Sequence, residues 1–243
     1  MKQLVENKDN SVLAKTAFIR KASHDIQGAF FAVSSVGPLL KIAAETGEDP
    51  APLLDHLIDA CQTYKYKLGN FLEYTRFDAG IQDATRERVN IGSLMRRLVR
   101  ENQAAASEKG IRVNLLISDQ MPEQMIGDEF RIAQICANLV SNAIQFSAPG
   151  SFVAVKVEKE GEENWTMVVE DHGEGMTTGE LNCVFSLLTI ERESLKNPGG
   201  LGLLVTRYLV EDVLKGRFTL FSQPQAGTTC KVVLPLSVGP VAE

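Results

Sequence analysis

Four short segments of the sequence combine residue types that can carry out chemistry. The first is Ser23-His24-Asp25, in which a carboxylate directly follows a histidine. A free imidazole titrates at about pH 6.5, so near neutrality it is largely uncharged and nucleophilic. The Asp25 carboxylate can accept the Nδ1 proton, fix the tautomer and leave the lone pair of Nε2 for attack. His24 and Asp25 are therefore candidate catalytic residues, although this segment alone also fits an ordinary surface histidine.

A pair of asparagines forms the second segment. Asn138 and Asn142 are one helical turn apart in a stretch with the pattern of a helix, so they share a helix face. Asparagine is unfavourable inside helices, and two on one face among apolar neighbours need an explanation. Amide oxygens are good ligands for Mg²⁺, which usually also binds substrate phosphates. The pair is a candidate magnesium site.

The other two segments are rich in glycine. Val169-Glu170-Asp171-His172-Gly173-Glu174-Gly175 places Asp-x-Gly-x-Gly at the end of an apolar run, and Gly199-Gly200-Leu201-Gly202-Leu203 precedes a second one. The glycines of the first let the backbone approach a ligand closely, and its aspartate can accept a hydrogen bond from an amine. Glycines at a helix N-terminus favour an anion site, because free amides point at phosphate. Each segment alone fits a turn, whereas the three in this order are far more specific.

The elements that position these segments begin with two long helices. Residues 10–45 carry alternating seven-residue apolar series, which predict a long bundle helix: Val12, Ile19, Ile26, Val33, Leu40 and Ala22, Ala29, Val36, Ala43. Pro38 predicts a bend, residues 46–50 a turn, and residues 54–75 a second helix with a similar seam. One hairpin buries only part of such seams, so we expect a homodimer with a four-helix bundle.

The same seven-residue series places His24 at the position of its helix that points farthest from the seam. We therefore expect its imidazole to be accessible to solvent. Phe30 and Phe31 follow His24 along the helix. They form either a docking surface beside the histidine or part of a wider bundle seam, and the sequence does not distinguish the two.

From about residue 84 onward the pattern changes to mixed α/β, which divides the chain into expected domains of residues 1–84 and 85–243. We expect strands at 87–91, 111–117, 152–157, 165–169, 217–221 and 228–234, and helices at 92–108, 128–146 and 201–214. Asn90 and Asp128 are expected N-caps. Residues 172–198 show no clear period and predict a long loop, which is usually functional in a compact domain.

Composition narrows the class of protein further. The 243 residues are 44% hydrophobic and 23% charged with a net charge of −6, typical of a soluble globular protein and not of a nucleic-acid binder. No apolar run approaches the ~20 residues of a membrane helix, so we expect no membrane segment and a cytoplasmic chain. The four cysteines are widely spaced, which argues against a zinc site or a disulfide framework.

Taken together, the segments resemble the H, N, G1 and G2 boxes of the sensor histidine kinases, whose ATP-binding domain has the Bergerat fold that is also found in gyrase and Hsp90. The resemblance spans residues 10–236 and implies an α+β chain: a dimeric helical hairpin followed by an α/β sandwich, with a mixed sheet and helices on one face. It implies ATP and Mg²⁺ as cofactors, a response-regulator receiver domain as partner, and a lid over ATP at residues 177–198.

The resemblance also implies individual roles. His24 accepts the γ-phosphoryl group, and Asp25 is its general base. Asn138 and Asn142 face Mg²⁺ and the phosphates, while Asp171 reads the adenine amine. The remaining residues implied in nucleotide binding are Gly173, Gly175, Gly200, Leu201, Gly202, Leu203 and Thr229.

Departures from the family pattern leave alternatives open. Gly28 replaces the Thr or Asn that helps the family dephosphorylate its partner, which predicts weak phosphatase activity. Gln145 replaces a common Lys, and Pro198 replaces the first G2 glycine. These changes favour a pseudokinase or histidine phosphotransfer protein as the first alternative. A gyrase- or Hsp90-type ATPase is the second, but it needs a glutamate base where this chain has Asn138.

Overall fold

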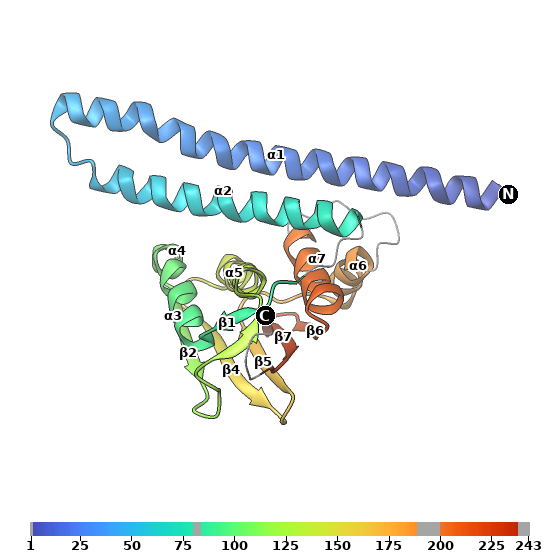
Figure 1. Ribbon diagram of the computed structural model, residues 1–243. Coiled ribbons are helices and arrows are strands. Elements are labelled where there is room, and N and C mark those ends of the chain that lie inside the picture. The colour runs from blue at the N-terminus through green and yellow to red at the C-terminus, as the bar shows by residue number, and fades with distance from the viewer. Residues whose placement is uncertain (1, 80–83, 189–199, 238–243) are drawn as a thin grey trace. The chain divides into compact units, whose positions relative to one another are not determined.

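The computed structural model describes residues 2–79, 84–188 and 200–237. These residues form two compact units, one within residues 2–79 and the other from 84–188 together with 200–237. The first unit is entirely helical, and the second combines strands with helices (Figure 1).

The helical unit is an antiparallel hairpin of α1 (Lys2–Thr46) and α2 (Ala51–Asp78) (Figure 1). Its seam buries the small residues Ala29, Val36 and Ala43 of α1, as the predicted seven-residue series requires. The helix continues through Pro38, so this proline does not end it. Small side chains at the seam let the two helices approach closely, and larger apolar residues remain on the outer faces.

The turn between α1 and α2 follows from its sequence. Gly47 has a φ of 75°, and the Glu48 amide donates to the Ala43 carbonyl at 3.0 Å, which is the glycine-dependent stop of a helix C-terminus. Asp49 then accepts a hydrogen bond from the Ala51 amide at 3.0 Å and caps the start of α2. The predicted turn at residues 46–50 is confirmed.

One part of α1 departs from the sequence expectation about membranes. Within the described residues, Ser23–Thr46 is long and apolar enough to cross a bilayer by length and composition alone. The same stretch contains the seam residues Ala29, Val36 and Ala43, which pack in the hairpin. Length and composition therefore do not separate a bundle helix from a membrane helix here.

The second unit is built on a five-stranded mixed sheet in the order β2-β4-β5-β7-β6. The first pair is parallel and the others are antiparallel. The strands are β2 (Arg112–Ile117), β4 (Phe152–Glu160), β5 (Asn164–Glu170), β6 (Arg217–Gln223) and β7 (Gly227–Pro235). β1 (Glu87–Val89) and β3 (Met125–Gly127) form a separate two-stranded sheet.

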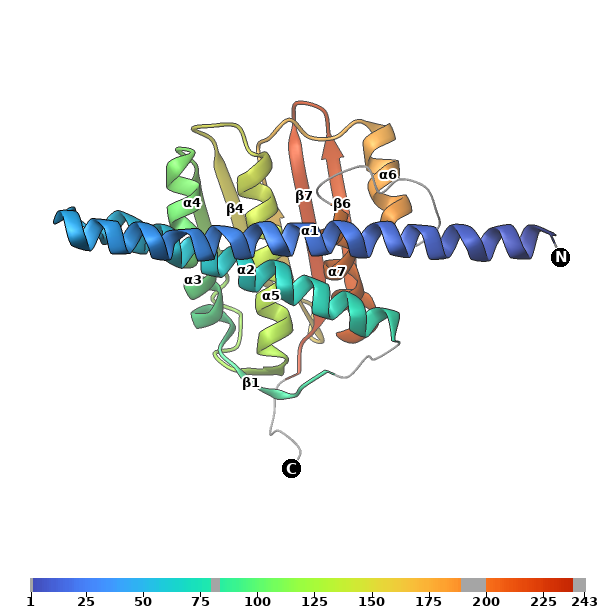
Figure 2. The same cartoon turned by 90° about the horizontal axis from the view of Figure 1, so that it is seen from above.

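Helices cover one face of the five-stranded sheet, as the α/β sandwich prediction requires (Figures 1 and 2). Alternation along β4 shows the two faces: Val153, Val155 and Val157 are buried toward the helices, whereas Lys156 is exposed on the other face and pairs with Glu170 at 3.3 Å. The covering helices include α3 (Ile91–Glu101), α4 (Gln103–Glu108), α5 (Glu129–Phe146) and α7 (Gly200–Tyr208).

Both predicted N-caps are confirmed. The Asn90 side chain accepts a hydrogen bond from the Ser93 amide at 2.8 Å, and Asp128 accepts one from the Arg131 amide at 3.0 Å. The expected helix at 92–108 is divided into α3 and α4, because the Asn102 side chain donates to the Leu98 carbonyl at 2.8 Å and ends the first helix. Side-chain bonds of this kind compete with helix continuation.

The structure corrects the prediction of a long loop at residues 172–198, because α6 (Thr178–Leu188) lies inside it. Thr177 Oγ1 accepts from the Glu180 amide at 3.3 Å, and Glu180 accepts from the Thr177 amide at 2.8 Å. This reciprocal pair is a capping box, and its Thr-x-x-Glu spacing is a sequence signal for the helix start. Residues 189–199 lie outside the described residues.

The last predicted helix, residues 201–214, is also divided. It consists of α7 and a wider π-helical turn, Leu209–Val213. Leu209 and Val210 are fully buried, and the sheet strands β6 and β7 follow as predicted, with Pro235 at the end of β7. The core of this unit therefore lies between the sheet and α3, α5 and α7.

Candidate functional site

His24 lies on the outer surface of α1, as predicted. Its side chain is 86% exposed, and Nδ1 lies 3.6 Å from Oδ1 of Asp25, whose side chain is 42% exposed. This spacing suits an electrostatic partner of the imidazole more than a direct hydrogen bond. The imidazole is open to an approaching group from solvent, while Asp25 faces the nitrogen that is not needed for attack through Nε2.

Phe30 and Phe31, which follow His24 along α1, have different surroundings. The Phe30 ring packs against Tyr64 of α2 with centroids 5.8 Å apart, although its side chain remains 56% exposed. Phe31 is 73% exposed and lies one heptad from His24. Because seven residues bring a helix back to nearly the same face, Phe31 and His24 share one side of α1.

Asp171 is a buried acceptor in the second unit. It is 7% exposed, and its Oδ1 accepts from the amides of Gly173 at 3.0 Å and Thr228 at 3.2 Å. No described residue donates to Oδ2. Burial raises the pKa of Asp171 above the ordinary value of 3.8, and the two backbone hydrogen bonds oppose this only in part. One oxygen is thus fixed, and the other remains for a ligand donor.

Glycines surround Asp171 because backbone passes too close for a Cβ. At Gly173 a Cβ would collide with the Phe146 carbonyl, and at Gly227 it would collide with the Asp171 carbonyl. Gly175 faces Gln223 in the same way and has a φ of 64°, which favours glycine. The predicted residues Gly173 and Gly175 therefore shape the backbone around the carboxylate.

The loop after Asp171 is fastened to the turn between β6 and β7. The Met176 amide donates to Ser222 Oγ at 2.9 Å, and the Gln225 amide donates to the Glu174 carbonyl at 2.7 Å. Both bonds join segments about 50 residues apart in the sequence. They fix the position of the Asp-x-Gly-x-Gly loop from the side of the sheet.

The structure places the side chain of Thr229, which the sequence predicts to bind nucleotide, on the face of the sheet away from the helices. Thr229 pairs with Glu170 and with Phe221, whose side chain is 61% exposed, on the face of the sheet away from the helices. Side chains alternate along a strand, so Thr228 lies on the helix-covered face. There its amide bonds to Asp171 and its hydroxyl lies 2.9 Å from Ser222 Oγ. Thr228 is therefore the one of the two adjacent threonines that lies beside Asp171.

Asn138 and Asn142 differ in their surroundings. Asn138 is 1% exposed, and its amide nitrogen donates to the Gly202 carbonyl and to Thr206 Oγ1 of α7. Asn142 is only partly buried, and no described residue hydrogen-bonds its side chain. The shared helix face is confirmed, but in this arrangement Asn138 connects α5 to α7, while Asn142 has the available amide oxygen.

The predicted phosphate-binding glycines lie at the start of α7. Gly200 is the first described residue of the helix, and Leu201, Gly202 and Leu203 follow within its first turn. A Cβ at Gly202 would collide with the side chain of Asn138, so glycine is needed there for α5 and α7 to pack. Gly199 and most of the predicted lid, apart from α6, lie outside the described residues.

The structure adds two residues that sequence reasoning missed at the end of α5. Phe146 is 54% exposed, and its carbonyl lies against Gly173. Ser147 forms a β-bridge with Gly173 and is 7% exposed, yet no described group bonds its hydroxyl. Two consecutive residues, one with an exposed ring and one with an unpaired buried hydroxyl, therefore adjoin the Asp171 loop at Gly173. Their adjacency depends on a bridge between distant segments, which no local sequence signal reveals.

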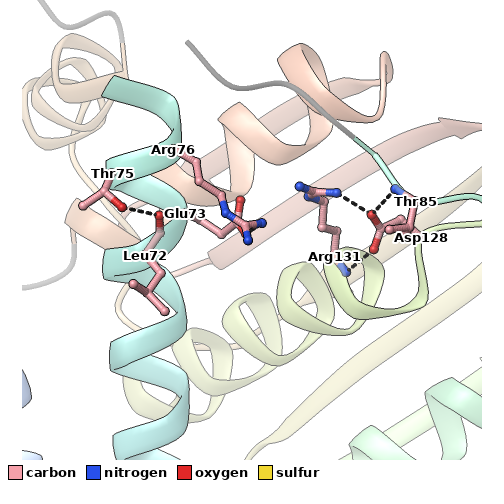
Figure 3. A network of polar contacts seen from close by, with 7 residues as sticks. All are labelled: Leu72, Glu73, Thr75, Arg76, Thr85, Asp128 and Arg131. Carbon is pink, nitrogen blue, oxygen red and sulfur yellow. Dashed lines mark hydrogen bonds and ion pairs between the residues drawn. The ribbon is translucent and has the colours of Figure 1, made fainter. Parts of the chain in front are cut away.

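The start of α5 is fixed by a buried ion pair (Figure 3). Arg131 Nη1 lies 2.5 Å from Asp128 Oδ2, which also accepts from the Thr85 amide at 2.9 Å. Burial alone would raise the pKa of Asp128, but the hydrogen bonds from Arg131 and Thr85 together lower it. The same figure shows an ion pair within α2, Arg76 with Glu73, at 3.1 Å.

Comparison with known proteins agrees with this geometry. Residues 127–238 match the family of histidine kinase-, DNA gyrase B-, and HSP90-like ATPases. The autoinducer 2 sensor kinase/phosphatase LuxQ of Vibrio harveyi is 29% identical over 94% of this chain and 27% of its own length. The sensor protein TorS of Escherichia coli K12 is 27% identical over 93% of this chain and 24% of its own length. The chain spans about a quarter of the length of these relatives.

Solved structures show the same fold. Full-length ShkA in complex with AMPPNP superimposes with a TM-score of 0.62 at 19% identity, over 79% of this chain and 39% of ShkA. The histidine kinase AdeS of Acinetobacter baumannii gives 0.58 at 17% identity, over 88% and 98%. Sensor kinases match nearly the whole chain at 27–29% identity, and the ATPase family model matches residues 127–238, so the chain is similar to the catalytic cores of sensor histidine kinases and has an ATPase-like domain at residues 127–238.

Proposed function

We propose that this chain binds ATP in its second unit, transfers the γ-phosphoryl group to His24 and then passes it to an aspartate of a response-regulator receiver domain. The observation that carries the proposal is the exposed His24 beside Asp25. The ATPase-like domain alone is shared with enzymes that hydrolyse ATP, whereas a solvent-facing nucleophile on a helical hairpin is what a histidine kinase requires.

The residues around Asp171 suit an adenine base. Oδ2 of Asp171 is an acceptor for the exocyclic amine, and Gly173 and Gly227 let neighbouring backbone pass close to this carboxylate. The exposed ring of Phe146 can stack on the base. Thr228, and not Thr229, is the threonine on this side of the sheet.

The phosphates belong at the other end of the site. The amides at the start of α7, from Gly200 onward, favour an anion. Mg²⁺ would neutralise charge on the transferred phosphoryl group, and the amide oxygen of Asn142 is the available protein ligand for it. In this proposal Asn138 positions α7 through the two hydrogen bonds that its amide nitrogen donates to Gly202 and Thr206.

In the proposed phosphoryl transfer to His24, one bond to phosphorus forms as another breaks. Nε2 of His24 attacks the γ-phosphorus, the bond from that phosphorus to the β–γ bridging oxygen breaks, and ADP leaves with the electron pair. The Nδ1 proton faces Asp25, which stabilises the positive ring formed on attack. Transfer then needs mainly positioning and charge neutralisation by the nucleotide unit.

We further propose that the chain is a cytoplasmic homodimer joined through its hairpin. Apolar side chains remain exposed on both helices after the hairpin forms: Ile19, Leu39, Ile42, Leu54, Ile58 and Leu72. A four-helix bundle of two hairpins would bury such residues. Phe31, exposed on the same side of α1 as His24, suits the docking of a receiver domain.

The proposal includes weak phosphatase activity, because Gly28 has no side chain to act near His24. No atom lies within 4 Å of the position of a Cβ at Gly28, so the space for a larger residue is open. Rapid dephosphorylation of a phosphorylated cognate receiver by this chain would contradict this part of the proposal.

One labelling experiment tests the main proposal. The purified chain is incubated with γ-labelled ATP and Mg²⁺, beside His24→Gln and Asn142→Ala variants. His56→Gln is the matched control, because His56 is an exposed histidine on α2. We expect acid-labile, base-stable label on the wild type and on His56→Gln, and none on the other two.

Other outcomes identify the alternatives. ATP binding without label on His24 would favour a phosphotransfer protein or pseudokinase, for which Gln145 is the motivating departure. Steady phosphate release that persists in His24→Gln would favour an ATPase. That outcome is not expected, because the Asn138 amide cannot act as a general base.

A further inference from the structure

Three polar side chains form a row across the sheet where the nucleotide base is proposed to bind. Ser222 of β6 lies opposite Thr228 of β7, and the Asp171 amide donates to the Thr228 carbonyl at 2.9 Å. All three residues continue the helix-covered face of their strands, two residues beyond the buried or half-buried Leu220, Cys230 and Val169. The apolar core thus ends in a polar row, Asp171-Thr228-Ser222.

The hydrogen bonds of Ser222 determine which of the two hydroxyls, Ser222 or Thr228, donates to the other. Its hydroxyl accepts from the Met176 amide at 2.9 Å, lies 3.0 Å from the Gly227 carbonyl, and lies 2.9 Å from Thr228 Oγ1. A carbonyl only accepts, so the single proton of Ser222 goes to Gly227. The proton between the two hydroxyls must then come from Thr228. Ser222 donates once and accepts twice, which uses its full capacity.

With this assignment, Thr228 and Asp171 can offer only hydrogen-bond acceptors to a ligand. The Thr228 proton is committed to Ser222, so the remaining capacity of Thr228 Oγ1 is to accept. Ionised Asp171 also only accepts, through Oδ2, because Oδ1 is occupied by two backbone amides. Two adjacent acceptors match the amine of adenine, directly or through water, and leave the 6-oxo oxygen of guanine without a donor.

We propose that Ser222 is a positioning residue that sets base specificity by fixing the direction of the Thr228 proton. The inference rests on the proposed nucleotide binding and goes beyond it, because Ser222 acts through Thr228 without touching the base. A purely structural function of Ser222, through its bonds to Met176 and Gly227, would affect all nucleotides equally. The ratio of affinities therefore separates the two.

The test measures dissociation constants of ATP and GTP, each with Mg²⁺, for the purified chain and its variants by calorimetry. In Ser222→Ala the Thr228 hydroxyl can rotate and donate to guanine, so the preference for ATP over GTP should fall about tenfold, the effect of one hydrogen bond. Ser222→Thr keeps the hydroxyl on a strand and should keep the wild-type preference. Thermal melting confirms that each variant is folded.

A double variant tests whether Ser222 acts on base specificity through the Thr228 hydroxyl. In Thr228→Val no hydroxyl is present, so adding Ser222→Ala should not change the ATP/GTP ratio further. Equal loss of ATP and GTP affinity in Ser222→Ala, or an unchanged ratio, would overturn the inference while leaving the proposed function intact. A wild-type chain that binds neither nucleotide would overturn the proposed function itself.

Discussion

At the scale of single residues, Asp171 combines burial with an unshared oxygen, and this has a measurable consequence in acid. Burial raises its pKa, so the folded protein holds this proton more tightly than the unfolded chain does. The ionised group therefore opposes folding at neutral pH, and the opposition disappears as the pH falls below 3.8. The proposed nucleotide binding would show the opposite pH dependence, because in that proposal the amine of adenine donates to the ionised carboxylate.

We expect ATP affinity to decline on acidification at a higher pH than an ordinary aspartate would cause, since protonated Oδ2 no longer accepts freely. Dissociation constants measured from pH 7 down to about pH 4 check this. Asp119→Asn, at an exposed aspartate, should leave the decline in place. Affinity that stays flat down to the ordinary value of 3.8 would show that the Asp171 pKa is not raised.

Gly202 is a second residue with a predictable effect. A Cβ there meets the buried Asn138 side chain, so Gly202→Ala should destabilise the second unit by about 1–3 kcal/mol, the usual range for overpacking. Urea unfolding followed by fluorescence reports this unit alone, because Trp165 is the single tryptophan and is buried in β5. Gly179→Ala is the control, since only Thr177 Oγ1, at 4.0 Å, is near its Cβ position.

At the scale of elements, α5 positions both asparagines and depends on the ion pair at its start. Asp128 is 1% exposed and Arg131 5%, so Asp128→Asn removes the carboxylate charge that pairs with a buried guanidinium. We expect a loss of about 3 kcal/mol at neutral pH in the same fluorescence assay. Glu162→Gln removes an ion pair of an exposed glutamate and should have little effect.

The pH dependence of this loss has a definite sign. The pKa of Asp128 is lowered in the folded protein, so its stabilising effect is fully present above the ordinary value of 3.8 and disappears as the pH falls through the folded value. The difference between wild type and Asp128→Asn should therefore shrink in strong acid. A difference that stays constant would mean that the charge of Asp128 does not contribute.

Elements determined by local signals could be predicted from the sequence, and those determined by distant contacts could not. Asn90 and Asp128 are N-cap residues that bond amides within the first turn of their helices, so the sequence predicts where these helices begin. The seven-residue series of α1 likewise predicts its buried seam. The Thr177–Glu180 capping box is an equally local signal, although the sequence analysis predicts a loop there. In contrast, the choice between Thr228 and Thr229 depends on strand register, and the burial of Asn138 depends on α7, more than 60 residues later. The sequence therefore located the site but not the orientation of its side chains.

At the scale of the whole molecule, the exposed apolar side chains of the hairpin predict its assembly. Ile42→Glu combined with Ile58→Glu places charges on two exposed apolar positions, 52% and 54% accessible, that a second hairpin would cover. We expect light scattering to give twice the 26.6 kDa chain mass for the wild type and the single mass for this variant. Lys41→Ala, at a polar exposed position of α1, should remain dimeric.

The same surface permits a direct test of the membrane alternative for Ser23–Thr46. If those side chains pack in a dimer, the purified wild-type chain should not float with phospholipid vesicles, because the bundle covers them. Flotation of the wild type, together with a monomeric mass in detergent, would assign the stretch to a bilayer and contradict the dimer.

If His24 is phosphorylated as proposed, the exposure of its side chain also limits the lifetime of the phosphoryl group. An imidazole that is 86% exposed remains equally open to water once it has become phosphohistidine, and the nearby Asp25 cannot shield the phosphorus–nitrogen bond. The phosphoryl group would therefore reach a receiver domain only if transfer to the receiver is faster than hydrolysis of the phosphorus–nitrogen bond. In the proposed function, the abundance of the receiver would then determine what share of the phosphoryl groups is transferred before hydrolysis.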